Sequence, residues 1–222
     1  MARVVAGTGG SGDKLSRSGG DSGERAQTKG DSVRPSRAPR TSSALIESDQ
    51  FETPDHIFLP LQTKYRFNLD LAATKENSKC GRVRCFTAED SALTKDWAEY
   101  GGEDWMWCNP PYSKPNLHAF TEKARQEVVR GAALVMLVPA TPGAGWFQNH
   151  IFFGHDLYEG GAVNPNEPMW LHGYELKLRG NGYLLKVRFL RKRVSFWQGG
   201  KPSKHGAATD SCLIEWRPRR LT

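Results

Sequence analysis

Short apolar runs alternate with polar stretches along most of the chain. Residues 67–71 alternate apolar and polar side chains and predict a strand, and the runs at 83–86, 105–108 and 134–138 predict three more. The polar segment 114–130, between the last two runs, predicts a helix. Such alternation of strands and helices is typical of an open α/β sheet.

The C-terminal part of the chain predicts further strands at 157–158, 183–190, 193–197 and 212–216. The last three lie close enough in sequence to include an antiparallel hairpin. Nearer the N-terminus, Thr53 and Pro54 predict the start of a helix, with Thr53 as its N-cap and Pro54 at its first position. Together these elements predict a single-domain, Rossmann-like α/β fold, with a mostly parallel sheet and an antiparallel C-terminal edge.

Composition separates the two ends of the chain from this domain. Residues 1–44 are rich in Gly, Ser, Arg, Lys and Asp and poor in large apolar side chains, so we expect a disordered basic tail there. Three interpretations of the tail stay open, namely loose DNA binding, a translation-start artefact and an inert extension. The folded domain is expected at 45–217 and a short basic tail at 218–222.

Net charge and cysteine content limit the class of protein. The 222-residue chain carries a formal net charge of +7, which favours a polyanionic partner. No apolar run reaches the roughly 18–20 residues of a membrane span, and the N-terminus lacks the apolar stretch of a secretory signal. The four cysteines form no Cys-x-x-Cys pair, which indicates reduced thiols in a cytoplasmic protein and no metal site.

Asn109-Pro110-Pro111-Tyr112 directly follows the apolar run 105–108. Two prolines make a stiff turn at the carboxyl end of the predicted strand, and the crevice beyond such ends is where α/β sheets bind ligands. The Asn109 amide, unpaired carbonyls and the flat ring of Tyr112 suit a planar base with an exocyclic amine. The alternatives are a surface turn or a Pro-Pro-Tyr ligand of an aromatic groove, but the strand before the motif favours a functional role.

The tetrapeptide belongs to a longer series of motifs in a fixed order. The series comprises Thr53-Pro54, Phe67-Asn68-Leu69-Asp70-Leu71-Ala72-Ala73, Asn77, Cys80, Asn109 to Ser113, Leu137-Val138-Pro139-Ala140, Arg188-Phe189-Leu190 and Arg193-Val194-Ser195-Phe196. It resembles the small phage-type DNA N6-adenine methyltransferases, in which Asn-Pro-Pro-Tyr is the catalytic motif. The resemblance spans about residues 49–216.

The resemblance implies methyl transfer from S-adenosylmethionine to the N6 amine of adenine in double-stranded DNA. The catalytic residues would be Asn109, Pro110, Pro111 and Tyr112. The Asn109 side-chain oxygen and the Pro110 carbonyl would accept hydrogen bonds from the amine, which localises the nitrogen lone pair for attack. Because a duplex hides this amine, the base would be flipped out and stacked on Tyr112.

The resemblance also implies five cofactor-binding residues, Thr53, Pro54, Asp70, Ala72 and Asp90. A helix N-terminus at Thr53 and Pro54 would meet the methionine carboxylate. Asp70 would hold the α-amino group or the ribose hydroxyls, and Ala72 would leave room for the cofactor. Asp90 would accept a hydrogen bond from the cofactor's adenine amine; the alternative for Asp90 is an ordinary helix N-cap.

Basic side chains in the C-terminal part are the candidates for phosphate contacts, although a solvated hairpin tip is the alternative. They are Arg188, Arg191, Lys192, Arg193, Lys201 and Lys204. The stretch 164–182, which is expected to be irregular, is a further candidate for DNA recognition.

Other substrates stay open from sequence alone. They are cytosine N4, RNA and a protein amide, and a non-catalytic DNA-binding protein with this fold is a further alternative. The intact motif favours catalysis, and Asn at its first position favours adenine or an amide. The resemblance suggests a phage or prophage protein that acts in the bacterial cytoplasm and shields phage DNA from host restriction.

Overall fold

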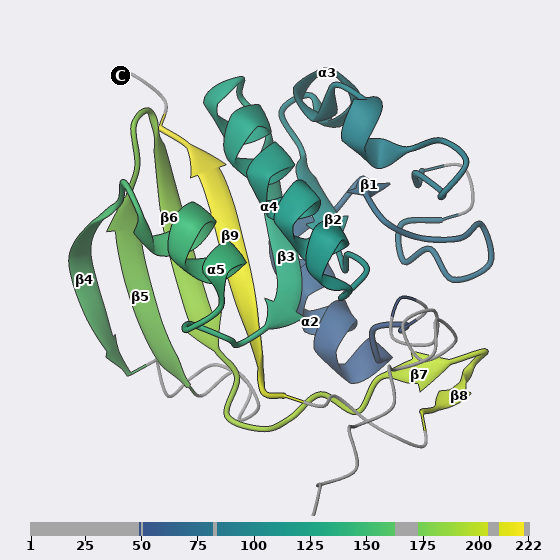
Figure 1. Ribbon diagram of the computed structural model, residues 1–222. Helices are drawn as coiled ribbons and strands as arrows, with labels where there is room; N and C mark the ends of the chain where they lie inside the picture. Colours follow the sequence, from purple (N-terminus) through teal and green to yellow (C-terminus); the bar gives the residue numbers. More distant parts are fainter. Residues whose placement is uncertain (1–48, 50, 82–83, 163–172, 204–208, 220–222) are drawn as a thin grey trace, which may run out of the picture. The chain divides into compact units, whose positions relative to one another are not determined.

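The computed structural model describes residues 49, 51–81, 84–162, 173–203 and 209–219 (Figure 1). They form a seven-stranded mixed sheet with strand order β1-β2-β3-β9-β6-β5-β4, together with a two-stranded sheet of β7 and β8. The predicted α/β class is therefore confirmed. The predicted N-terminal tail and the last three residues of the C-terminal one lie outside the described part of the chain.

Three strands at one end of the sheet are parallel. β1 (Leu69–Asp70) pairs with β2 (Trp105–Cys108), and β2 pairs with β3 (Ala133–Pro139). Cys85 adds a single parallel bridge to Asp70. β2 has the predicted bounds, whereas β1 is shorter than predicted because the chain turns directly after Asp70.

The other half of the sheet is antiparallel. β9 (Ser211–Pro218) lies between β3 and β6 (Tyr183–Phe189), and β5 (Tyr174–Arg179) and β4 (Asp156–Ala162) complete the sheet. The pairings of β3 with β9, β9 with β6, β6 with β5 and β5 with β4 are all antiparallel. The antiparallel part is therefore wider than the predicted edge.

Two predictions in the C-terminal part are wrong. The stretch 164–182, expected to be irregular, contains β5, whose leucines alternate with charged residues as in a half-buried strand, a pattern that the prediction overlooked. The strand predicted at 193–197 is not formed at 193–196. Alternate side chains there are buried as in a strand, but regular pairing begins only with β7 (Trp197–Gln198) and β8 (Lys201–Pro202).

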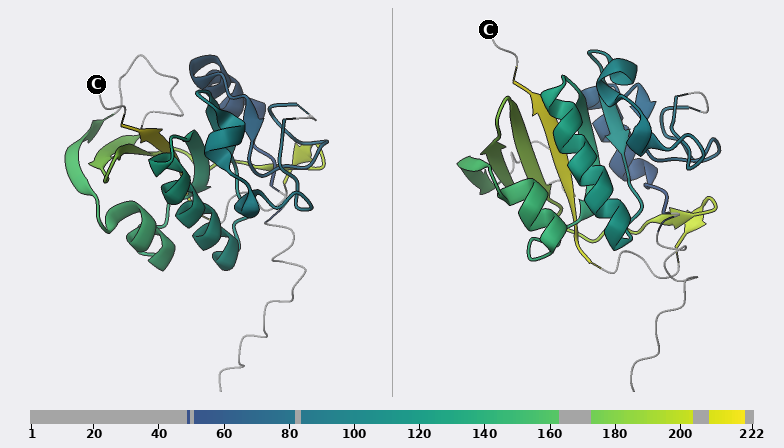
Figure 2. Two further views of the ribbon diagram at one scale, coloured as in Figure 1. Left: turned by 90° about the horizontal axis from the view of Figure 1, so that it is seen from above. Right: turned by 45° about the horizontal axis from the view of Figure 1, so that its top comes forward.

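Helices cover both faces of the parallel half of the sheet (Figure 2). α4 (Lys114–Val129) lies on one face and α2 (Asp55–Tyr65) on the other. The remaining helical segments are short: η1 (Ala92–Thr94), α3 (Trp97–Gly101), α5 (Gly145–Phe147) and η2 (Gln148–Phe152), a π-helix.

The alternation of side chains along β2 supplies two hydrophobic clusters, one on each face. Met106 and Cys108 pack in the cluster that contains the buried face of α4. Trp107 points the other way and packs with Phe58 and Phe67, at ring-centroid distances of 5.4 Å from each. Residues that follow β2 are therefore held by packing on both sides of the sheet.

The start of α2 differs from the prediction by one residue. Pro54 is the N-cap, and its carbonyl accepts from the N–H groups of Ile57 and Phe58 at 3.0 and 3.1 Å. Thr53 is therefore not the N-cap. Its hydroxyl is buried and has no hydrogen-bond partner among the described residues.

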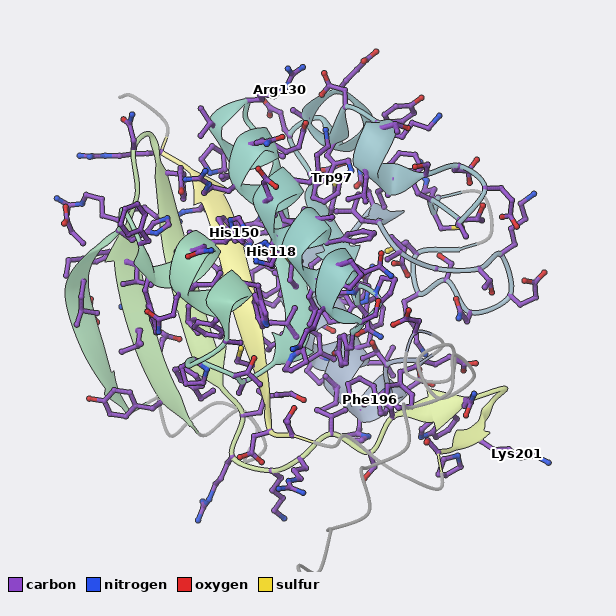
Figure 3. The ribbon with its side chains drawn as sticks, in the orientation of Figure 1. Trp97, His118, Arg130, His150, Phe196 and Lys201 are labelled. Atoms are coloured by element: carbon purple, nitrogen blue, oxygen red, sulfur yellow. The ribbon has the colours of Figure 1, made fainter. Side chains whose placement is uncertain are left out.

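A buried carboxylate fastens α3 to α4. Glu127 accepts a hydrogen bond from the N–H of Ala98 at 3.1 Å and pairs with Lys123 at 2.7 Å. The Lys123 ammonium also lies 5.9 Å from the centre of the Trp97 ring, and Figure 3 shows Trp97 beside α4. These contacts fix the orientation of α4, whose first residue follows the Asn-Pro-Pro-Tyr-Ser motif.

Candidate active site and cofactor cavity

A cavity of about 870 Å³ lies at the carboxyl ends of β1 and β2. This volume is near the upper end of the range for small-molecule sites. The strands place the lining directly, because Leu71 to Thr74 follow β1, and Asn109 and Pro111 follow β2. The remaining lining residues are Asp49, Phe51, Glu52, Glu76, Asn77, Phe86, Thr87, Ala88, Ser91, Ala92, Leu93, Asn116, Phe120, Gln198, Gly199 and Gly200.

The lining is negatively charged although the chain as a whole is basic. Asp49, Glu52 and Glu76 contribute carboxylates, whereas no Lys, Arg or His is among the described residues of the lining. Carboxylates without cations disfavour a phosphate and favour a ligand that bears positive charge. The cavity is therefore suited to a cationic small molecule and a neutral ring rather than to the backbone of a nucleic acid.

The Asn109 amide has a partner at each end. Its Nδ2 donates to the backbone carbonyl of Phe51 at 2.7 Å, and its Oδ1 accepts from the Tyr112 hydroxyl at 3.0 Å. The same hydroxyl lies 3.0 Å from the carbonyl of Leu137. Because a tyrosine has one hydroxyl proton, the two acceptors share it. The motif thus presents Asn109 in a fixed orientation at the cavity wall.

Tyr112 lies behind Asn109 and does not line the cavity. Its ring packs edge-on against Phe51 and Phe196, at centroid distances of 6.5 and 5.6 Å. Burial raises the pKa of its hydroxyl well above the usual value, so the hydroxyl remains a donor. Pro110 is buried and is also absent from the lining, whereas Pro111 borders the cavity. The motif residues are together, but only two of the four face the cavity.

Residues Asp49, Phe51 and Glu52, here called the clasp, cover the motif from the N-terminal side. Asp49 accepts from the N–H of Ser113 at 3.0 Å and from the Asn116 side chain at 3.4 Å. Glu52 exchanges two backbone hydrogen bonds with Trp197, at 2.8 and 3.0 Å. The clasp therefore joins the start of α4 to the β7–β8 hairpin.

The hairpin completes one wall of the cavity. The Glu52 carboxylate accepts from the N–H of Gly199 at 2.9 Å, and the turn that Gly199 and Gly200 form borders the cavity. Both glycines have positive φ, 58° and 72°, a conformation that side chains with a Cβ rarely adopt. Sequence reasoning missed the clasp and this turn because neither has a local pattern that predicts its distant partner.

Asp70 supports the cavity from beneath rather than lining it. It is 2% exposed, and its carboxylate accepts from the N–H groups of Ala72 and Lys79 at 3.3 and 3.1 Å. Burial raises its pKa to about 6, against the opposing effect of the hydrogen bonds from Lys79 and Ala72. Asp70 therefore shapes the loop that leaves β1, and Ala72 within that loop does line the cavity.

Asp90 turns away from the cavity. Its carboxylate accepts from the N–H and the hydroxyl of Thr87, both at 2.9 Å, and the backbone bond is the main cause of its lowered pKa. It is not a helix N-cap either, because Ser91 holds that position for η1. The polar lining here comes instead from Thr87 and Ser91.

Of the five cofactor-binding candidates, only Ala72 lines the cavity; Thr53 and Pro54 are buried outside it. Sequence reasoning missed Thr74, Asn77, Thr87 and Ser91, which supply hydroxyl and amide groups. Their signal was available, because they lie within the first six residues after the predicted strands at 67–71 and 83–86.

Arg188 does not present its charge to DNA. It is 7% exposed, and its guanidinium contacts Glu175 across the β5–β6 pair through two nitrogens, at 3.0 and 2.7 Å. Its assignment as a phosphate contact is therefore wrong, because an ion pair within the sheet occupies it. The prediction failed because β5, which carries Glu175, was not expected.

The other basic candidates lie along the edge that holds the motif. Arg191, Lys192 and Arg193 are exposed directly after β6, which ends beside the carboxyl end of β3. Arg193 contacts the exposed Asp210 at 3.3 Å. Lys201 is exposed on β8, next to the glycine turn that borders the cavity, and Figure 3 shows it extending outward. Lys204 lies outside the described residues.

No group of three or more His, Cys, Asp and Glu side chains in the described part of the chain is arranged to hold a metal ion. Among the helices formed by the described residues, none is long and apolar enough to cross a membrane.

Comparison with known proteins agrees with the motif at the cavity. A protein of Escherichia phage T1 named "DNA N-6-adenine-methyltransferase" is 32% identical over 100 residues, which cover 45% of this chain. The match covers 39% of the phage protein, well under half its length. "Putative methyltransferase YfdM" of Escherichia coli (strain K12) is 43% identical over 67 residues, which cover 29% of this chain and 71% of that protein. No solved structure matches.

The family comparison covers the cavity and its motif. The model of the family described as DNA N-6-adenine-methyltransferase (Dam) matches residues 41–155. This range includes the clasp, the loop after β1, the segment after Cys85 and the Asn-Pro-Pro-Tyr motif. More than half of the chain is matched, and the chain belongs to the DNA N-6-adenine-methyltransferase (Dam) family.

Proposed function

We propose that this protein transfers a methyl group from S-adenosylmethionine to the N6 amine of adenine in double-stranded DNA. This proposal rests on one observation: Asn109 and Pro111 line the same cavity as the residues that follow β1 and Cys85. The cavity has room for a cofactor and an extruded base together. The fold is proposed to be the Rossmann-like fold of methyltransferases.

The lining fits this cofactor. S-adenosylmethionine supplies a methyl group on a positively charged sulfur and also carries an ammonium and a carboxylate group, so its net charge is positive. The carboxylate of Glu76 and the amide of Asn77 are proposed to hold the ammonium end, and the hydroxyls of Thr87 and Ser91 the ribose or adenine end. The absence of Lys, Arg and His from the described lining means that no cation there opposes the positive sulfur.

Asn109 is proposed to act on the substrate amine. Its Oδ1 has two lone pairs, of which the Tyr112 hydroxyl engages one, so the second can accept a hydrogen bond from N6–H. This bond draws the nitrogen toward tetrahedral geometry and localises the lone pair that attacks the methyl carbon. As the new N–C bond forms and the S–C bond breaks, the amine loses one proton to solvent. Much of the rate comes from alignment of the two reactants.

DNA is proposed to bind along the edge of the sheet that holds the motif. Arg191, Lys192 and Lys201 are exposed there and can contact phosphates on either side of the target base. The negative cavity keeps the phosphates outside and admits the neutral base. The family relationship with a phage T1 protein supports a phage or prophage origin.

The proposal is tested by incubating the protein with unmethylated double-stranded DNA and S-adenosylmethionine labelled on its methyl group. After digestion to nucleosides, label is expected in N6-methyl-2′-deoxyadenosine and not in N4-methyl-2′-deoxycytidine. RNA and a glutamine peptide serve as alternative acceptors. Asn109→Ala is the matched variant, and it should bind the cofactor without transferring the methyl group. Label in another acceptor, or none in DNA, contradicts the proposal.

A further inference from the structure

We propose that the backbone carbonyl of Phe51 sets the orientation of the Asn109 amide, so that an oxygen and not a nitrogen faces the substrate amine. This inference rests on the proposed function for its catalytic meaning, although the orientation itself can be tested separately. It makes Phe51, and the aromatic stack that holds it, positioning residues for the reaction.

The orientation follows from the chemistry of the two contacts. A backbone carbonyl can only accept, so the atom of Asn109 that lies 2.7 Å from the Phe51 oxygen must be the Nδ2 donor. Because the amide is planar, Oδ1 then lies on the other side, where the Tyr112 hydroxyl reaches it at 3.0 Å. A reversed amide would place two acceptors together at Phe51 and lose that contact, whereas the Tyr112 hydroxyl oxygen could still accept from Nδ2, so the Phe51 carbonyl decides the orientation.

The Phe51 carbonyl is held by contacts on both sides of it in the chain. The Phe51 ring stacks on Phe196 with a centroid distance of 5.1 Å and an angle of 7° between the planes. Phe196 is fully buried, and the adjacent Trp197 exchanges two backbone hydrogen bonds with Glu52. On the other side, Asp49 is anchored to Ser113. The carbonyl therefore sits in a frame that includes the start of α4 and the β7–β8 hairpin.

This frame distinguishes Asn from Asp at position 109. A carboxylate has no N–H to give to the Phe51 carbonyl, and at the Asn109 position it would bring two negative oxygens together. A protonated carboxyl group can still donate. The Asn109→Asp variant should therefore be tolerated when protonated and disfavoured when ionised. The carboxylates of Asp49, Glu52 and Glu76 in the same lining act in the same direction, so the contribution of the Phe51 carbonyl is the pH dependence in excess of that of a control in this lining.

The first experiment measures the orientation without reference to activity. Urea unfolding of wild type and Asn109→Asp is compared at about pH 5 and about pH 8. The midpoint of the variant should be close to that of wild type at the lower pH and clearly below it at the higher one. Asn77→Asp is the matched control, because the Asn77 oxygen is the acceptor for Thr74 and a carboxylate can replace it. An Asn109→Asp midpoint that shows no more pH dependence than the control overturns the inference.

The second experiment measures the effect on the reaction. Phe51→Leu and Phe196→Leu should lower kcat on the order of 10- to 100-fold. For Phe196→Leu, whose ring lies outside the cavity lining, the dissociation constant of S-adenosylmethionine should be unchanged. Phe51→Tyr keeps the stack and should restore kcat. Phe189→Leu is the matched control, because its ring stacks on Phe147 at 6.5 Å, outside the cavity lining. If both variants keep the kcat of this control, Phe51 is not a positioning residue.

A third measurement tests the orientation of the Asn109 amide even if a variant folds poorly or the protein does not methylate DNA. Hydrogen exchange of the Asn109 side-chain amide, followed by NMR, should be slow in wild type and faster in Phe51→Leu. Protection without DNA methylation would overturn the proposed function and leave the orientation intact. Rapid exchange in wild type, together with active methylation, would overturn the inference alone.

Discussion

The carboxylate of Asp49 accepts a hydrogen bond at 3.0 Å from the backbone N–H of Ser113, the N-cap residue of α4. A negative charge at a helix N-terminus is stabilising, and Ser113 supplies no side-chain cap of its own. The contact joins residues 64 positions apart in the chain. Asp49 therefore caps α4 from a segment that is distant in the sequence.

Asp49→Ala should lower the free energy of unfolding by about 1 kcal/mol, because the Ser113 N–H loses its acceptor. Asp49→Asn keeps an acceptor and should cost less. Urea unfolding measures both, with Asp156→Asn at an exposed position of β4 as the control. Equal stability of Asp49→Ala and wild type would contradict a capping role.

Tyr112→Phe removes the hydroxyl and keeps the ring, so it distinguishes the role of the hydroxyl from that of the ring. Loss of the hydroxyl leaves the Leu137 carbonyl and Asn109 Oδ1 without their shared donor, so we expect a loss of about 1–3 kcal/mol in stability and a lower kcat. Unfolding and steady-state kinetics measure these, and the exposed Tyr100→Phe is the control. If the ring alone matters, through stacking on the flipped base, Tyr112→Phe keeps kcat and only Tyr112→Ala loses it.

Asp70 should make stability depend on pH. Its pKa rises from 3.8 to about 6 on folding, so at a pH between these two values the folded state holds a proton that the unfolded state has lost. The stabilisation is present below the unfolded pKa and is lost as pH rises through about 6, with a total on the order of 3 kcal/mol. The stability of wild type relative to Asp70→Asn should fall across this window. A difference that stays constant with pH, as measured by urea unfolding, would refute it.

Lys201 should contribute to DNA binding through charge alone. Lys201→Ala is expected to weaken binding of all sequences alike and to reduce the slope of log affinity against log salt by about 1. The control is Arg217→Ala, because Arg217 is exposed at the opposite edge of the sheet, near the amino end of β3. Titrations at several salt concentrations test this. If the Arg217 variant weakens binding and the Lys201 variant does not, DNA lies on the other edge.

The position of the motif could be predicted from sequence because its cause is local. An apolar run followed by two prolines defines both a strand and its end, so β2 and Asn109 were predicted where they lie. The Ala72 loop follows from β1 in the same way. Capping was harder, since Thr53 and Asp90 have the residue types of N-caps but the chain uses Pro54 and Ser91.

The contacts that fix the catalytic amide could not be predicted from sequence. Phe51 and Asn109 are 58 positions apart, and Phe196 stacks on Phe51 from the far end of the chain. Such contacts depend on how the sheet is assembled, and no short pattern contains them. The assignment of Arg188 failed for a different reason, because its partner Glu175 lies on β5, a strand that was overlooked although its apolar and charged residues alternate.

The negative lining of the cavity has a consequence for turnover under the proposed reaction. The spent cofactor keeps its ammonium group but has a neutral sulfur, so it loses the part of the attraction that the lining carboxylates exert on the sulfonium charge. The same side chains that favour capture of the donor thus speed departure of the by-product. A protein with this cavity should resist inhibition by its own leaving group, and it should do so less well at high ionic strength.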